Sequence, residues 1–149
     1  MTRPVDDLRR LVGREVGMGD WLEVTQERID RFADATDDHQ WVHVDPEAAA
    51  AGPFGSIIAH GYLTLSLLPR LTQGLEPSMG DVKMTINYGL DRLRFVTPVP
   101  AGGRIRARVT LTEVTEVQGG AQVRRLVTVE LEGSEKPACV VEVLTRYLW

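Results

Sequence analysis

Apolar residues change their spacing near the middle of this 149-residue chain. Up to about residue 74 they recur with the spacing of helices, whereas from Asp81 onward apolar and polar residues alternate as they do in β-strands. The alternation is clearest over Arg104–Val117, whose apolar face consists of Ile105, Ala107, Val109 and Leu111. The second half therefore predicts strands over Val82–Phe95, Arg104–Val117, Ala121–Glu132 and Ala138–Leu148, with Gly119-Gly120 as a hairpin turn.

The first half predicts short helices and one strand. The helix that begins at His60-Gly61 is apolar nearly all round, which indicates that it is buried, and Pro69 should kink or shorten its last turns. Thr25 and Asp45 are suitable N-cap residues for two earlier helices. The expected elements are a helix over Val5–Val12, a strand over Gly19–Val24, helices over Thr25–Thr36 and Glu47–Ala51, and a turn at Gly52-Pro53-Phe54-Gly55.

These elements predict a single α+β domain over residues 1–149. One buried helix and four or five antiparallel strands cover each other best when the sheet curls around the helix. Such packing leaves the other sheet face partly apolar, and we expect a second copy of the chain to cover it.

Composition narrows the class of protein and its location. Apolar residues make up 43% and charged residues 26%, and 17 basic against 21 acidic residues give a net charge of −4, which argues against a nucleic-acid partner. Cys139 is the single cysteine, so no intramolecular disulfide can form and a cytoplasmic location is expected. The amino-terminal residues lack the apolar run of a secretory signal, and Tyr62–Leu71 is too short to span a membrane.

Two of the three histidines lie in the segment Asp37–Pro46. On a helix, His39 and His43 would share a face and could bind a metal with a nearby carboxylate. The segment contains weak helix formers, and no glutamate stands between the two histidines as in a zinc-peptidase helix. We therefore expect no metal here.

Asp38 and His43 are the candidate acid–base pair. Five residues apart, they would point about 140° away from each other on a helix, so only a non-helical loop lets both face one water molecule. A carboxylate and an imidazole that share a water can orient it and move its protons near neutral pH. The alternative is structural, with Asp38 capping nearby backbone and His43 as a half-buried loop residue.

Gly61 offers a second chemical group at the start of the buried helix. The first residues of a helix have unpaired N–H groups and a partial positive charge, and glycine has no side chain to keep a ligand away. The Gly61 N–H could therefore polarise a carbonyl as an oxyanion hole. A glycine that merely permits a tight helix entry would look the same.

Together these motifs resemble the MaoC-like dehydratases, the (R)-specific enoyl-CoA hydratases of the hotdog superfamily, which have NodN-like relatives. The family pattern is an Asp, four residues, a His, an Asp-Pro and later a His-Gly. It matches Asp38, His43, Asp45-Pro46 and His60-Gly61, and the similarity extends through Phe32–Pro46, Gly52–Gly55, Asn87–Leu90 and Arg94–Val99. Gln40-Trp41 replaces the Asn-Pro of many members, and Pro69 lies near a position where some carry serine.

The resemblance implies a hotdog fold, a homodimer and a hydro-lyase of fatty acid metabolism that needs no cofactor. Asp38 and His43 would hold the water that adds to a trans-2-enoyl thioester, and the Gly61 N–H would bind the thioester carbonyl. Further candidates for substrate contact are Gln40, His60, Asn87 and Arg94. Arginines on the strands could also meet the phosphates of coenzyme A, or could simply be solvated; these are Arg92, Arg94, Arg104, Arg106 and Arg108.

Two other functions use the same fold. A hotdog acyl-CoA thioesterase would activate water at the carbonyl carbon, and a non-catalytic acyl-CoA-binding subunit would serve in a heterodimer. Asp38 and His43 argue against the second, because some such subunits lack this pair. The acyl chain length, and the choice between CoA and acyl-carrier protein, do not follow from the sequence.

Overall fold

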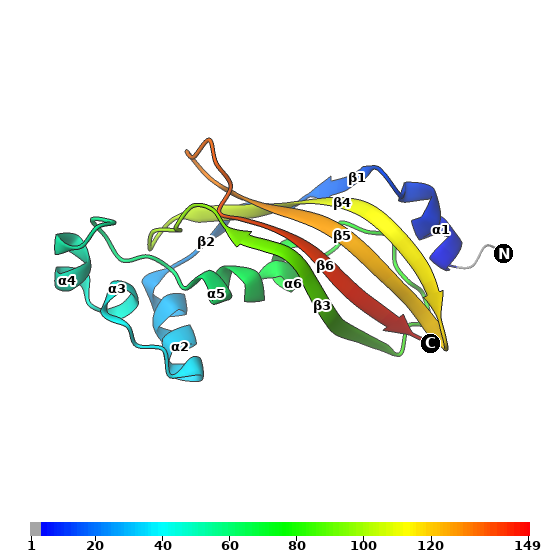
Figure 1. Ribbon diagram of the computed structural model, residues 1–149, viewed down its shortest axis with the longest axis horizontal. Helices are drawn as coiled ribbons and strands as arrows, with labels where there is room; N and C mark the ends of the chain where they lie inside the picture. Colours follow the sequence, from blue (N-terminus) through cyan, green and yellow to red (C-terminus); the bar gives the residue numbers. More distant parts are fainter. Residues whose placement is uncertain (1–3) are drawn as a thin grey trace.

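One antiparallel sheet forms the centre of the protein, whose computed structural model describes residues 4–149. Its six strands follow the spatial order β1-β4-β5-β6-β3, and β2 also pairs with β4. The sheet curls, and the helices α5 (Gly61–Ser66) and α6 (Leu68–Leu71) lie against its concave side (Figure 1). The strands are β1 (Glu15–Met18), β2 (Leu22–Glu23), β3 (Met84–Phe95), β4 (Arg104–Val117), β5 (Gly120–Leu131) and β6 (Cys139–Leu148).

Six short helices accompany the sheet in the described part of the chain. They are α1 (Pro4–Leu11), α2 (Gln26–Thr36), α3 (Trp41–Val44), α4 (Pro46–Ala51), α5 (Gly61–Ser66) and α6 (Leu68–Leu71). Among residues 4–149, no helix has the length and apolar character needed to cross a membrane. Figure 1 shows α5 and α6 under the sheet and α2, α3 and α4 beyond one end of it.

The buried helix is broken, as the position of Pro69 predicts. Pro69 falls in the first turn of α6, where its missing N–H costs no helical hydrogen bond, and Leu67 joins the two helices. The expectation of one long helix is therefore wrong: the chain covers the sheet with two short helices.

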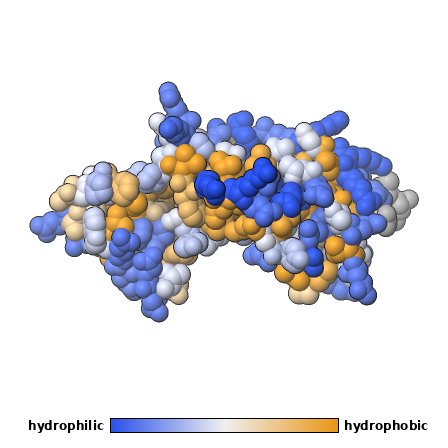
Figure 2. Space-filling view, viewed as in Figure 1, coloured by the Kyte–Doolittle hydropathy of each residue, from blue (hydrophilic) through white to orange (hydrophobic). Residues whose placement is uncertain are grey.

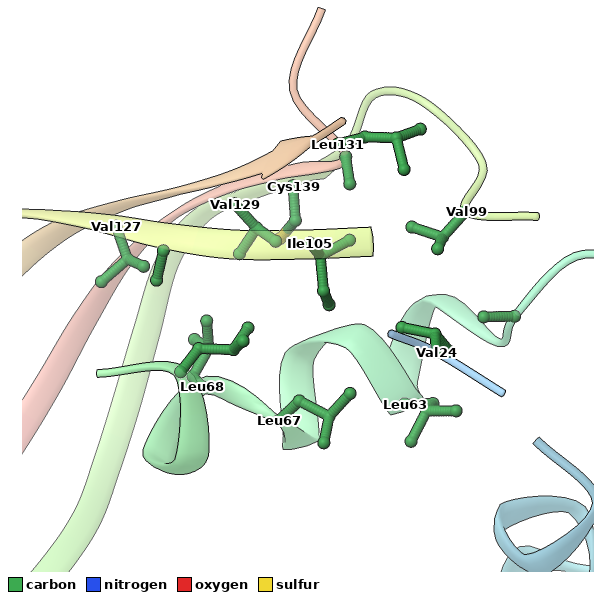
Figure 3. Packing of buried hydrophobic residues seen from close by; sticks show 14 of the residues in the cluster. Val24, Leu63, Leu67, Leu68, Val99, Ile105, Val127, Val129, Leu131 and Cys139 are labelled. Atoms are coloured by element: carbon green, nitrogen blue, oxygen red, sulfur yellow. The ribbon is translucent and has the colours of Figure 1, made fainter. Parts of the chain in front are cut away.

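The period-two pattern of the strands sets the core. Ile105, Ala107, Val109 and Leu111 of β4 are fully buried, and the inward residues of β5 continue this surface. Leu63, Leu67 and Leu68 of the broken helix pack against it (Figure 3). Each fully buried Val, Leu or Ile stabilises the fold by roughly 1.5–3 kcal/mol.

Two sequence-based boundaries are wrong for local reasons. The expected strand Gly19–Val24 is instead β1 and β2 on either side of Gly19, where the chain passes so close to Leu71 that a Cβ on Gly19 would lie 2.4 Å from the Leu71 carbonyl oxygen. The hairpin turn lies one residue earlier than predicted, because Gly120 pairs with Val117 in the ladder and Gly119 takes the positive φ of 72°.

Cys139 lies in the core, as the sequence indicated. It has no exposed surface, and burial raises the pKa of its thiol from the ordinary 9.0 to about 11. A pKa about two units higher lowers the thiolate fraction at pH 8 about a hundredfold.

We therefore expect the folded protein at pH 8 to react with an aromatic disulfide reagent at least about a hundredfold more slowly than the same protein in urea. The unfolded chain should release one equivalent of thiolate per chain. Fast, stoichiometric labelling of the folded protein would contradict the burial of this side chain.

Candidate active site

The candidate catalytic residues meet beyond the end of the sheet, where α2 stops. Thr25 caps the start of α2 by accepting a hydrogen bond from the Arg28 N–H at 3.2 Å. At its other end Asp37 takes a left-handed conformation with φ 56°, which ends the helix abruptly. The Asp38 N–H still bonds to the Ala33 carbonyl at 3.1 Å, so the loop begins from a fixed position.

His43 lies on a single helical turn, α3, rather than in the irregular loop that the sequence predicted. Because this turn begins only at Trp41, Asp38 stays outside it and the expected convergence with His43 is kept. His43 Nδ1 lies 2.7 Å from the Ile58 carbonyl oxygen. A carbonyl can only accept, so Nδ1 carries the proton and Nε2 holds a free lone pair.

His60 contacts both residues of the candidate pair. Its side chain is 2% exposed and stacks on the His43 ring, with centroids 3.8 Å apart and planes inclined by 24°. His60 Nε2 donates to the Asp38 backbone carbonyl at 3.0 Å, while Nδ1 is buried without a hydrogen-bond partner in the described chain. His60 was expected to contact substrate; the structure places it under Asp38 and His43.

One side-chain ligand atom from each of Asp38, His43 and His60 lies within 4.8 Å of the other two. The Asp38 side chain is about half exposed, so the cluster opens to solvent on its side. One water can therefore bridge the Asp38 carboxylate and His43 Nε2.

Two imidazoles and a carboxylate are also a ligand set that divalent metals accept. The geometry is therefore compatible with a bound divalent ion as well as with a shared water.

Gly61 begins α5, so its N–H has no acceptor within the helix. The structure also explains why this residue is glycine, since a Cβ there would lie 3.0–3.1 Å from the Phe95 ring. The structural and functional interpretations of Gly61 are therefore compatible: the close packing of Phe95 requires glycine, and glycine leaves the N–H accessible.

The remaining candidate residues lie at different distances from Asp38 and His43. His39 is exposed, and its Nε2 lies 2.8 Å from an Asp34 carboxylate oxygen. The Gln40 backbone N–H contacts an Asp38 carboxylate oxygen at 3.4 Å and so helps to position it. Asn87 lies near the opposite end of β3 from Phe95, far from the pair, and Arg94 is exposed on the same strand.

Three of the candidate arginines are engaged elsewhere. Arg104, Arg106 and Arg108 pair with Glu132, Glu130 and Glu15 on the outer face of the sheet. Arg106 also stacks over Trp21, 4.2 Å from the ring centroid. Their role is that of solvated strand residues, whereas among residues 4–149 no carboxylate pairs with Arg92 or Arg94.

Two features were not predicted from the sequence: the contacts that position His43, and a cavity beside the helices. The Ile58 carbonyl fixes the His43 ring, and Gln26 Nε2 donates to the His43 carbonyl at 3.0 Å; no local pattern marks either contact. A cavity of about 850 Å³ also lies between α5, α6 and the inner face of the sheet. Its buried Arg125 could have been noticed, because it occupies an inward position between Val123 and Val127.

The fold is that of the hotdog class, with a carboxylate and two imidazoles gathered beside the start of α5. Among solved structures, the R-hydratase PhaJ1 from Pseudomonas aeruginosa aligns with a TM-score of 0.73 and 25% identity, over 92% of this chain and 81% of that one. The MaoC like domain family matches residues 7–132, and the chain belongs to this family, as its motifs suggested.

Curated relatives agree with this assignment. The 3-hydroxyacyl-thioester dehydratase Z of Mycobacterium tuberculosis is 54% identical over 145 residues, which is 97% of this chain and 95% of the relative. Nodulation protein N of Rhizobium leguminosarum bv. viciae is 44% identical over 142 residues, 93% of this chain and 88% of the relative.

The buried position of His60 leads to a stability prediction. His60→Ala should lower the free energy of unfolding by about 2–4 kcal/mol, because it leaves a cavity under His43 and removes the donor to the Asp38 carbonyl. Urea denaturation measures the change. His39→Ala is the matched control, and loss of its exposed pair with Asp34 should change stability by less than about 1 kcal/mol. Equal effects of the two variants would contradict the supporting role of His60.

Proposed function

We propose that this protein is an (R)-specific enoyl-CoA hydratase, or equally a 3-hydroxyacyl-thioester dehydratase, because the reaction is reversible. The observation that carries the proposal is the convergence of Asp38 and His43, with His43 Nδ1 bonded to Ile58 and Nε2 left free to accept a proton. Membership of the MaoC-like family and the extended similarity to a 3-hydroxyacyl-thioester dehydratase support the same reaction.

In hydration, the shared water attacks C3 of a trans-2-enoyl thioester. The new C–O bond forms as Asp38 and His43 accept the water proton, and the double-bond electrons move through C2 to the thioester oxygen. A proton from the pair then reaches C2, which gives the 3-hydroxyacyl thioester. Dehydration follows the same steps in reverse, and neither direction transfers electrons to a cofactor.

The Gly61 N–H stabilises the enolate-like oxygen of this pathway. It stands at the positive end of α5, beside the Phe95 ring. A preorganised donor of this kind contributes about 2.7–4 kcal/mol to the transition state in acyl-transfer enzymes. The carbonyl acidifies C2, so the protein has only to position donors and a base.

Arg94 and Arg92 are the arginines best placed for the phosphates of coenzyme A. Both lie on β3, close in sequence to Phe95 and therefore to Gly61, and both are exposed. The planar guanidinium of arginine binds phosphate oxygens in pairs. An acyl-carrier protein would present its phosphopantetheine to the same strand.

A homodimer completes the proposal. Strand β3 is twelve residues long, and within residues 4–149 it pairs only with β6 and forms an open edge of the sheet. It carries exposed apolar side chains, namely Met84, Tyr88, Leu90 and Phe95. Figure 2 shows apolar side chains gathered over the middle of the molecule, where β3 and α5 lie in Figure 1. A long, apolar edge strand can pair with an edge strand of another molecule, and β3 of a second copy is such a strand.

Substitution of the pair tests the reaction. Asp38→Asn and His43→Gln should each lower kcat for hydration of crotonyl-CoA by roughly 10²–10⁴, the usual contribution of a general acid–base group. Because both residues act on one water, the double variant should be little worse than the poorer single variant. Loss of the enoyl absorbance measures hydration, and release of free thiol would instead indicate a thioesterase.

His39→Gln is the matched control for this experiment, since its side chain pairs with Asp34 away from the water. It should keep activity within about tenfold, and EDTA should have no effect. Inactivation by EDTA, or loss of activity in His39→Gln with His43→Gln unaffected, would favour a metal site over the shared water.

The dimer is tested by light scattering. A single chain has a mass of 16.6 kDa. We expect twice that mass at micromolar concentration, because an interface of this kind buries on the order of 2,000 Å², which is typical of a stable dimer. Leu90→Lys in β3 should shift the mass toward that of one chain, whereas a lysine on the outer face, as in Thr128→Lys, should not. A fully active protein with the mass of one chain would exclude the dimer as a requirement.

A further inference from the structure

His60 is a buried titratable side chain that takes no part in the proposed reaction. It is 2% exposed, and its ring contacts two other aromatic rings. It stacks on His43, with centroids 3.8 Å apart and planes inclined by 24°, and it meets Phe32 with centroids 4.9 Å apart. Its Nε2 donates to the Asp38 backbone carbonyl at 3.0 Å, so separate parts of one imidazole contact the two residues of the proposed pair.

These contacts define one tautomer of His60. The Asp38 carbonyl can only accept a hydrogen bond, so Nε2 carries the proton. Nδ1 is buried and has no hydrogen-bond partner among residues 4–149, so it keeps a bare lone pair. A second proton at Nδ1 would be buried without an acceptor, and the surroundings therefore satisfy the neutral ring protonated at Nε2.

The unpaired nitrogen argues against a purely structural role for this imidazole. A buried polar atom without a partner is destabilising, and it offsets the gain from the hydrogen bond at Nε2. An apolar ring such as that of phenylalanine could fill this space without an unpaired polar atom. The presence of an imidazole is therefore explained by what its Nε2–H and its ring face hold in place.

The ring face of His60 restricts His43 in a direction that the hydrogen bond of His43 leaves open. The bond from His43 Nδ1 to the Ile58 carbonyl, at 2.7 Å, fixes one edge of the His43 ring but lets the ring tilt. The stacked His60 ring fixes the plane, and with it the direction of His43 Nε2. When Nε2 accepts the water proton, the resulting imidazolium lies against the π face of a neutral ring, which attracts positive charge.

The Nε2–H of His60 restricts Asp38 at the same time. Asp38 follows the end of α2, and its side chain is about half exposed. The His60 N–H binds its backbone carbonyl from a position 22 residues further along the chain, and His60 Nε2 lies 4.0 Å from a carboxylate oxygen of Asp38. The start of α5 thus anchors the loop that carries this carboxylate.

We propose that His60 is the positioning residue that holds the Asp38 carboxylate and His43 Nε2 at the spacing of one shared water. This inference rests on the proposed function, which assigns the water to these two residues. In place of the substrate contact that the sequence led us to expect, His60 acts on the rate through its two neighbours. A displacement of about 1 Å within a reacting group can lower the rate about 10²-fold, so the effect falls on kcat.

Two substitutions separate the two contacts. His60→Phe keeps an aromatic ring against His43 and removes the donor to Asp38, whereas His60→Gln keeps an amide N–H donor and removes the ring. Each should lower kcat for crotonyl-CoA hydration by roughly 10–100-fold and leave KM within about threefold, because neither contact involves the substrate. A raised KM at unchanged kcat, or the wild-type kcat in both folded variants, would overturn the proposal.

The same two substitutions at His39 are the matched controls. His39 is exposed and pairs with Asp34, so His39→Phe and His39→Gln should leave kcat close to that of the wild-type protein. Equal losses of kcat at His39 and His60 would show that these substitutions act without positioning the pair, and would also overturn the proposal.

Combination with His43→Gln distinguishes positioning from a loss of folded protein. If His60 acts through the pair, its substitution has little left to affect once His43 is replaced. In that background His60→Phe and His60→Gln should therefore lower kcat by less than about twofold. A merely structural role would reduce the active fraction equally in both backgrounds, and effects that multiply in this way would refute the positioning role.

The wild-type protein gives a test that does not depend on the folding of any variant. Nitrogen-15 NMR distinguishes protonated from bare imidazole nitrogens, and at pH 8 it should show His60 protonated at Nε2 and bare at Nδ1. A His60 ring protonated at Nδ1 in place of Nε2 could not donate to the Asp38 carbonyl, and this result would overturn the proposal.

The two proposals can fail separately. If the wild-type protein hydrates no enoyl-CoA, the hydratase is refuted, and the NMR signals of the His43 ring still show whether His60→Gln moves that ring. Unchanged His43 signals in His60→Gln would refute the positioning role. If the wild-type protein hydrates crotonyl-CoA and the folded His60 variants do so equally well, the positioning role is refuted and the hydratase stands.

Discussion

The packing of the broken helix against the concave face of the sheet is the constraint on which the rest of the structure depends. Leucines of α5 and α6 cover the inward residues of β4 and β5, and this contact fixes where α5 begins. Because Gly61 stands at that beginning, the position of its N–H is set by the main core rather than by a loop. A donor held in this way loses little freedom when a ligand binds, which is what electrostatic catalysis requires.

The geometry of the proposed pair, Asp38 and His43, also depends on this core, through the start of α5. His60 precedes Gly61, stacks on His43 and bonds to the Asp38 carbonyl, so the start of α5 connects the two residues of the pair. The Ile58 carbonyl fixes the His43 tautomer from the strand-like segment before the helix. The short elements α2 and α3 thus gain a defined geometry from contacts to the core, which they could not maintain as isolated helices.

Buried polar groups occur at two places along the cavity side of the molecule, with different consequences. At the start of α5 two buried imidazoles lie beside the half-exposed carboxylate of Asp38, an arrangement suited to proton transfer. Between β5 and the segment that follows α6, the Arg125 guanidinium and the Glu76 carboxylate satisfy each other.

The sequence by itself determined what depends on near neighbours. The alternating apolar residues of β4, the caps at Thr25 and Asp45, and the break at Pro69 each act within a few residues, so their effect is visible in a linear pattern. The spacing of Asp38, His43 and His60-Gly61 also identified the family and predicted that Asp38 and His43 face each other.

Only the tertiary structure decided which partners these residues meet. His60 reaches Asp38 across 22 residues, Arg125 reaches Glu76 across 49, and the approach of Leu71 divides the strand expected at Gly19. Local spacing carries no information about such contacts, because they arise when distant elements pack to bury their apolar faces. The roles of His60 and Arg125 therefore follow from packing, although the sequence already contained both residues.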